Sequence, residues 1–168
     1  MSRENVEVVR SIYSAWERGV SAREFIDADV EYVNPSYAVE PGVRRGRRVF
    51  AAIRDAYDDV AIAPQQFVDV GDDVVVVATI TGTSHGAGVP ISREHGYVWT
   101  IRDGRAVRFQ WFHSGAEAFE AVGLPVPPEP EPGSGPGSGE QAQPDELPGP
   151  GELPGPGEQP EPGSGERA

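Results

Sequence analysis

A sharp change in composition near residue 126 limits what this chain can fold into. From Val126 to Ala168 the sequence holds 12 of the chain's 17 prolines and 10 of its 21 glycines, with no aromatic residue and few aliphatic ones. Such a segment cannot bury enough apolar surface to offset the entropy of ordering its backbone. We therefore expect one folded domain over residues 3–124, followed by a disordered acidic tail rich in Pro, Gly and Glu over residues 126–168.

Charge and residue content exclude several classes of partner. The tail carries nine acidic residues and one arginine, a net of −8, which leaves −5 of the chain's −13 for the domain. An acidic domain offers no electrostatic footprint for a phosphate backbone, so we expect no nucleic-acid partner. The sequence starts MSRENVEVVR, without an apolar leader core, and contains no run of 18 apolar residues. We therefore expect a cytoplasmic protein with no membrane partner.

Apolar spacing and turn residues predict the order of the elements. Helices are expected from the N-terminus to Gly19, over 22–26, over 47–58 and over 114–122. Strands are expected over 29–34, 65–70, 74–83, 91–102 and 106–113, with Asp103-Gly104 as the strongest hairpin signal. Helices that mostly precede an antiparallel meander are typical of an α+β fold, in which helices cover one face of a curved sheet.

Four consecutive valines, from Val74 to Val77, make their strand apolar on both faces. Such a strand belongs in the interior of a sheet. One of its faces would meet the helices, and the other would meet a partner subunit or a covering element. Because an apolar face is seldom left to water, this run also predicts a homodimer through the sheet.

Five segments resemble one known family. They are VRSIYSAWERG at 9–19, DVEYVNP at 29–35, VDVGDDVVV at 68–76, VWTIRDGRAVRF at 98–109 and AEAFEAVGL at 116–124. Together with the element order they resemble the SnoaL-like proteins, which are related to polyketide cyclases and ketosteroid isomerases within the nuclear-transport-factor-2-like superfamily. The resemblance covers about residues 3–124. It implies a cone-shaped sheet with helices on its concave face, one apolar pocket that takes a small apolar molecule, and a homodimer.

The catalytic positions that this resemblance implies are altered. Ketosteroid isomerase uses an Asp base, which precedes a proline in that family, together with a Tyr and a protonated Asp. The base position holds Asn34, an amide that cannot take up a proton at neutral pH. The tyrosine position falls on Ile12, with Tyr13 one residue away, and the protonated-Asp position falls on Tyr97. Steroid-type isomerisation is therefore disfavoured, and both an enzyme and a binding protein remain as hypotheses.

His95, Tyr97 and Trp99 share one face of their expected strand, since strands alternate with a period of two. If this face lines the pocket, His95 is the best general base, because imidazole titrates near neutrality. Tyr97 would then donate to a developing oxyanion and Asn34 would orient the substrate. These three are the predicted catalytic residues. A solvated His95 at the rim is the competing interpretation, and a reversed face would replace these residues with Glu94, Thr100, Arg108 and Gln110.

Eight further side chains are predicted to bind the ligand, or else to form plain core: Tyr13, Trp16, Tyr32, Phe50, Tyr57, Trp99, Gln110 and Phe112. His113 is expected to be structural and His85 exposed. The histidines lack metal-ligand spacing and no dinucleotide fingerprint is present, so we expect no metal and no cofactor. The basic cluster at 44–48 is expected to be a solvated loop.

Three functions fit these observations. The first is a small-molecule enzyme of the polyketide-cyclase or isomerase type that acts by proton transfer. The second is a non-catalytic protein that binds an apolar metabolite. The third is a dimeric structural or assembly module.

The tail is predicted to be dispensable for folding. A chain that ends at Pro128 loses almost no apolar residue, so its thermal unfolding midpoint should match that of the full chain within about 3 °C. Differential scanning calorimetry of both proteins checks this. A much larger fall in the midpoint would show that the tail packs on the domain.

Overall fold

The computed structural model describes residues 2–55 and 57–127, with side chains for 3–51 and 58–127. Nearly all of the predicted tail, residues 128–168, lies outside the described residues. The elements are α1 (Ser2–Glu17), β1 (Ile26–Asn34), β2 (Gly42–Arg45), α2 (Arg48–Asp55), β3 (Tyr57–Val70), β4 (Asp73–Ser84), β5 (Pro90–Arg102), β6 (Arg105–Phe112) and α3 (Gly115–Ala121). Within the described part of the chain, no helix is long and apolar enough to span a bilayer.

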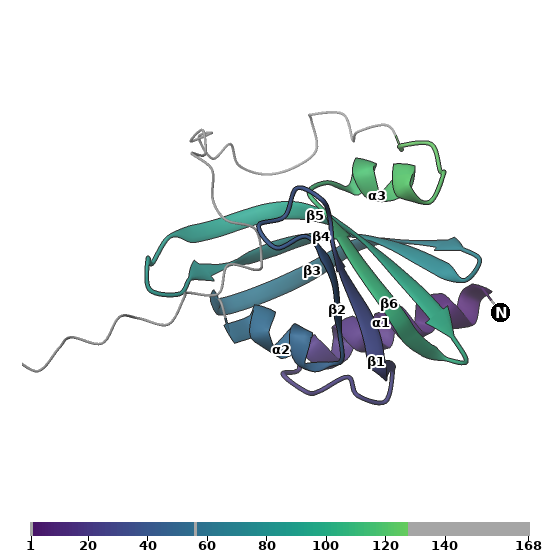
Figure 1. Ribbon diagram of the computed structural model, residues 1–168, viewed down its shortest axis with the longest axis horizontal. Helices are drawn as coiled ribbons and strands as arrows, with labels where there is room; N and C mark the ends of the chain where they lie inside the picture. The colour runs from purple at the N-terminus through teal and green to yellow at the C-terminus, as the bar shows by residue number, and fades with distance from the viewer. Residues whose placement is uncertain (1, 56, 128–168) are drawn as a thin grey trace, which may run out of the picture.

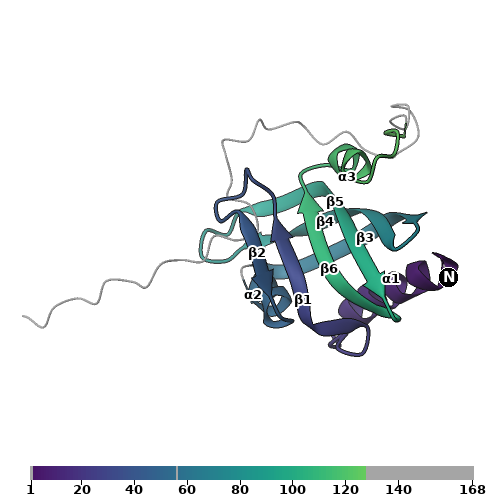
Figure 2. The same ribbon diagram turned by 45° about the vertical axis from the view of Figure 1, so that its right-hand side comes forward.

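All six strands form one curved sheet in the order β2-β1-β6-β5-β4-β3 (Figure 2). Strands β3 to β6 are an antiparallel meander, as predicted. Strand β1 returns beside β6 and pairs with it in parallel, and β2 forms an antiparallel hairpin with β1. The predicted α+β class and curved sheet are confirmed.

The helices divide between the two faces of the sheet (Figure 1). Helices α1 and α2 lie on one face and contact β3 most, and we call this the inner face. Helix α3 lies on the opposite, outer face against β5, β4 and β6. The expectation that helices cover the concave face therefore holds for α1 and α2 and is wrong for α3.

Three local predictions are corrected by long-range pairing. The helix expected over 22–26 is a turn, because Ile26 starts β1 and pairs with Ala106 of β6. The loop expected before α2 contains β2, whose Arg45 lies opposite Glu31 and forms an ion pair with it at 2.8 Å. Strand β3 starts at Tyr57, well before residue 65, because its first half pairs with β4.

The four valines of β4 are buried on both faces within one chain. Val74 and Val76 belong to the inner core, and Val75 and Val77 belong to a second cluster on the outer face. Side chains from β6, α3 and the segment after it complete that second cluster: Phe112, Ala118, Phe119, Val122 and Leu124. The covering element expected from the sequence is therefore α3. The homodimer stays a prediction, but these valines no longer require it.

The packing of α3 on the sheet depends on Gly96 of β5. A Cβ atom at this position would lie 2.4 Å from the carbonyl oxygen of Ser114 and 2.6 Å from the Cβ of Ala118. Both distances are far below van der Waals contact. Glycine at 96 therefore allows the start of α3, capped by the Ser114 hydroxyl, to lie directly on the strand.

Gly96→Ala should lower the free energy of unfolding by about 2–3 kcal/mol, because the added methyl group pushes α3 off the sheet. Chemical denaturation of both proteins measures this. Ser92→Ala, on an exposed position of the same strand, is the control and should change little. An unchanged stability for Gly96→Ala would contradict this packing.

Candidate functional site

Strand pairing brings the candidate residues together on the inner face. Across β6, β5 and β4, one row contains Phe109, Trp99 and Val74, and the next contains Trp111, Tyr97 and Val76. His95 follows beside Ala78, and its ring centroid lies 6.2 Å from that of Tyr97. His95 and Tyr97 therefore face the side of the sheet that α1 and α2 cover. The predicted face of β5 is confirmed.

A one-residue shift in the pairing of β5 with β6 decides which β6 side chains join them. A regular hairpin at Asp103-Gly104 would place Gln110 opposite Tyr97. The register shifts between Thr100 and Ile101, so that Val107 is an extra residue and Trp111 lies opposite Tyr97 instead. A shift of one residue turns every later side chain to the other face.

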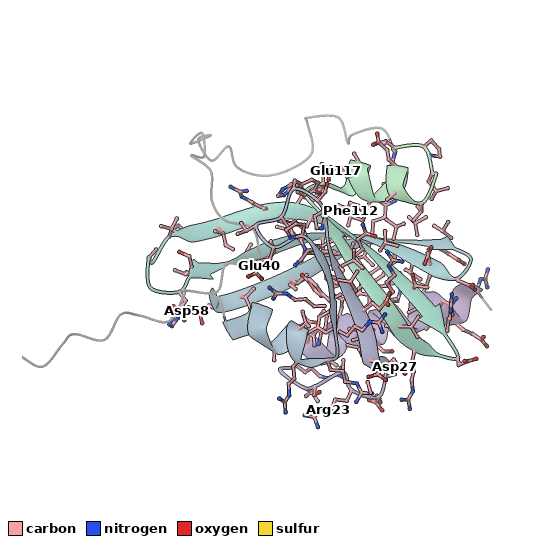
Figure 3. All side chains as sticks on the ribbon, viewed as in Figure 1. Arg23, Asp27, Glu40, Asp58, Phe112 and Glu117 are labelled. Carbon is pink, nitrogen blue, oxygen red and sulfur yellow. The ribbon has the colours of Figure 1, made fainter. Side chains whose placement is uncertain are left out.

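The shift corrects the prediction for β6. Gln110 pairs with Val98 and lies on the outer face, and Phe112 belongs to the outer cluster beneath α3. Figure 3 shows Phe112 close to Glu117 at the start of that helix. Phe109 and Trp111, which the sequence did not single out, take their place on the inner face.

The deep part of the inner face is a packed aromatic core. Trp99 is 0% exposed, so no void large enough for water adjoins its ring. Its ring lies 4.5 Å from that of Phe109, 5.8 Å from that of Phe50 and 5.8 Å from that of Trp16. Tyr32 closes the cluster against Phe50 and Phe109. Of the predicted ligand contacts on this face whose side chains are described, Trp16 and Phe50 alone keep partial exposure.

Tyr57 is a further predicted ligand contact, but its side chain lies outside the described residues. Tyr13, predicted beside the family's tyrosine position, points into the core. Its hydroxyl oxygen accepts a hydrogen bond from Trp99 Nε1 at 3.2 Å, which leaves its own O–H group able to donate. Burial, and then the nearby Tyr97, raise the pKa of Tyr13 well above its usual value. The Tyr13 phenol therefore stays protonated at neutral pH, deep beside Tyr97.

Asn34 is held by two hydrogen bonds of fixed direction. Its Oδ1 accepts from Trp111 Nε1 at 2.8 Å, and its Nδ2 donates to the carbonyl oxygen of Glu40 at 2.8 Å. An indole N–H only donates and a carbonyl only accepts, so these partners fix the amide orientation. Asn34 shares the inner face with Tyr97, but Trp111 of β6 lies between them. The two hydrogen bonds of Asn34 tie the loop before β2 to the sheet.

His95 is a buried imidazole, and no carboxylate among the described side chains pairs with it. It is 7% exposed and lies 5.9 Å from the Trp111 ring and 6.3 Å from the His113 ring. Burial, then the positive charges of His113 and Arg93, lower the pKa of His95 to about 4, while a hydrogen bond to the Phe112 main chain opposes them. His95 is therefore neutral at physiological pH and can accept a proton or a hydrogen bond.

The rim beside His95 is closed by a residue that the sequence did not single out. The Tyr37 ring stacks on His113 at 4.5 Å, and its hydroxyl donates to the Glu117 carboxylate at 2.5 Å. Partial burial and this carboxylate raise the pKa of Tyr37 to about 12. His113 thus lies at the rim of the inner face beside His95 and Trp111, in contact with the Tyr37 loop and with Glu117 of α3. Only the position of Tyr37 after the strand-ending Pro35 could have indicated this role.

The basic cluster and His85 form ion pairs and hydrogen bonds away from the candidate site. Arg44 forms an ion pair with Glu40, and Arg47 Nε donates to the carbonyl oxygen of Ile26. His85 Nδ1 lies 3.0 Å from an Asp58 carboxylate oxygen in an exposed turn. Among the described side chains, no group of three or more His, Cys, Asp or Glu could hold a metal ion.

Comparison with known proteins identifies the family. The profile of the SnoaL-like domain matches residues 9–109, which is more than half of the chain. The chain therefore belongs to the SnoaL-like domain family. No curated protein matches it.

Solved structures share the fold. An NTF2-like protein of unknown function from Burkholderia pseudomallei is 26% identical, with a TM-score of 0.57 over 74% of this chain and 100% of that one. A SnoaL-like, polyketide-cyclase-like protein from Jannaschia sp. is 18% identical, with a TM-score of 0.59 over 75% of this chain and 96% of that one. A protein with a ketosteroid-isomerase-like fold from Catenulispora acidiphila, in complex with trimethylamine, is 22% identical, with a TM-score of 0.54 over 71% and 94%. The last two, below 25% identity, show the fold alone.

Burial of a neutral His95 should make stability depend on pH. In the unfolded chain a histidine binds its proton near pH 6.5, whereas folded His95 binds it only near pH 4. The unfolded state is therefore favoured as the pH falls through this window, by about 3 kcal/mol in total. Urea unfolding between pH 7 and pH 4 should therefore show a larger loss of stability in the wild type than in His95→Gln.

His85→Gln is the matched control, since His85 is exposed in the turn between β4 and β5. This variant should lose stability with falling pH as the wild type does. Equal pH dependence in the wild type and His95→Gln would contradict a buried neutral His95.

Proposed function

We propose that this protein binds a small apolar molecule at the rim of the inner face and moves a proton on it, as polyketide-cyclase-type and isomerase-type enzymes do. The substrate would carry an acidic hydrogen, as an enol or a carbon acid beside a carbonyl does. We place this activity in a cytoplasmic homodimer. The family membership supports a small-molecule function of this kind only in outline, because one fold hosts many chemistries.

The observation that carries the proposal is the state of His95. It is buried on the inner face beside Tyr97, and its low pKa keeps it neutral at physiological pH. A general base has to be unprotonated before it can act. Asn34 cannot take this role, since an amide does not ionise and both ends of this one are engaged. Among the predicted catalytic residues, only His95 can accept a proton.

The other two predicted residues receive different tasks. The Tyr97 phenol, with Tyr13 beside it, would donate a hydrogen bond to the oxygen on which negative charge develops. Asn34 would act indirectly, by holding Trp111 and the loop that precedes β2 in place. Tyr13, Tyr32 and Trp99 would support the site from beneath, and Trp16 and Phe50 would offer apolar contact.

A non-catalytic binding protein is the second candidate, and the surroundings of His95 favour it. The charged groups that shift the pKa of His95 are His113 and Arg93, and both lower it. A pKa near 4 makes His95 a weak acceptor, because proton-transfer catalysis is most efficient when the base has a pKa near the working pH. A ligand could therefore be held by a hydrogen bond to His95 without being transformed.

Exchange of a carbon-bound hydrogen separates the two functions. The probe is 2-tetralone, a bicyclic ketone with acidic hydrogens beside its carbonyl, incubated with the full chain in deuterium oxide and followed by NMR. We expect the protein to accelerate deuterium incorporation. His95→Gln should reduce the acceleration by about 10²–10⁴-fold, the usual effect of one general base.

His85→Gln serves again as the matched control and should keep wild-type exchange. Tryptophan fluorescence should report binding of the probe in every variant. Binding without accelerated exchange would support the non-catalytic function instead. Exchange that survives His95→Gln would exclude His95 as the base. Native mass spectrometry of the purified protein, compared with denaturing conditions, would identify any ligand that co-purifies.

A further inference from the structure

Arg93 is a positive charge on the inner face without a described counter-charge. It lies on β5 two residues before His95 and opposite Ile80 of β4, so it shares the inner face with both. Its side chain is half-buried. Among the described residues no carboxylate forms an ion pair with it. By contrast, Arg44 and Arg45 of β2 form ion pairs with Glu40 and Glu31.

The described groups around Arg93 offer little negative charge. The His113 ring lies 6.3 Å from that of His95. Among the described residues, the charged groups that act electrostatically on His95 are His113 and Arg93, and none is a carboxylate. Glu117 is the acidic member of this network, but it accepts from the Tyr37 hydroxyl and from the His113 main-chain N–H. Glu94, the next residue on β5, lies on the outer face against Gly115. The site is thus rich in nitrogen donors and poor in acceptors.

Arg93 is half-buried, and among the described side chains no carboxylate pairs with its charge. A bound ligand could supply the missing charge. Guanidinium groups match carboxylates and other anionic oxygens through paired, charge-assisted hydrogen bonds. The aromatic residues below, among them Trp111 and Tyr97, offer a flat apolar surface to the body of such a ligand.

We propose that Arg93, with His113 at the rim, forms a subsite for an anionic oxygen, so that the ligand of this protein is an apolar molecule bearing a carboxylate or an enolate. This inference rests on the proposed function and names its ligand class. Arg93 binds the negative oxygen, and the aromatic side chains contact the apolar body. The same charge would stabilise an enolate formed by proton transfer to His95.

The test compares two probes with the same ring system, one anionic and one neutral. They are 2-naphthoate and 2-naphthalenemethanol, titrated into the full chain at neutral pH and low salt and followed by tryptophan fluorescence. We expect 2-naphthoate to bind about tenfold more tightly than the alcohol. Arg93→Gln should bring the two affinities within about twofold by weakening naphthoate alone. Unchanged binding of the alcohol shows that this variant is folded.

Arg108→Gln is the matched control. It removes the same charge from an exposed position on β6, and it should keep the preference for 2-naphthoate. Equal affinities of the two probes in the wild type would overturn the subsite and leave the apolar site intact. A preference that survives Arg93→Gln would also overturn it. Failure of both probes to bind would count against the proposed function itself, and the subsite would fall with it.

Discussion

The pairing of β5 with β6 is the constraint on which the candidate site depends. One extra residue in β6, Val107, moves every later pair by one position. Trp111 rather than Gln110 therefore lies beside Tyr97, and Trp111 in turn provides the N–H group that holds Asn34. Without this bulge the inner face would present an amide and a phenylalanine next to His95. The aromatic surface and the Asn34 anchor both follow from a single backbone irregularity.

The inner face changes in character from its centre to its rim. Trp99, Phe109 and Phe50 are packed against one another and leave no water-sized void at Trp99. Toward the rim the side chains become polar. His95 is buried there and Arg93 is half-buried, and no described carboxylate pairs with either of them. This division assigns the packed aromatic residues to stability and leaves the rim for the proposed function. A rigid apolar floor also fixes the orientation of the polar groups above it.

Much of the fold was predictable because it depends on near neighbours in the sequence. Helical spacing indicated α1, alternation and the Asp103-Gly104 turn indicated β5, and the Ser114 cap indicated α3. The face shared by His95 and Tyr97 was predictable too, since it needs only a period of two. Strand β2 and the first half of β3 were missed, because their residues become strands only by pairing with partners far along the chain. Tyr37 was missed for the same reason, since its contacts lie on α3 and after β6.

The sequence by itself determined the α+β class and the face of β5 that carries His95 and Tyr97, and its composition predicts a domain boundary near residue 126. These follow from composition and local periodicity, whereas the loss of an ionisable base at Asn34 is what the family resemblance implies. Tertiary structure decided which face α3 covers, which β6 residues reach the site, and that His95 is neutral beside Arg93, which forms no ion pair with any described residue. Those properties depend on register and burial. A one-residue bulge reverses a face, and desolvation by distant segments shifts a pKa, so neither can be read from neighbouring residues.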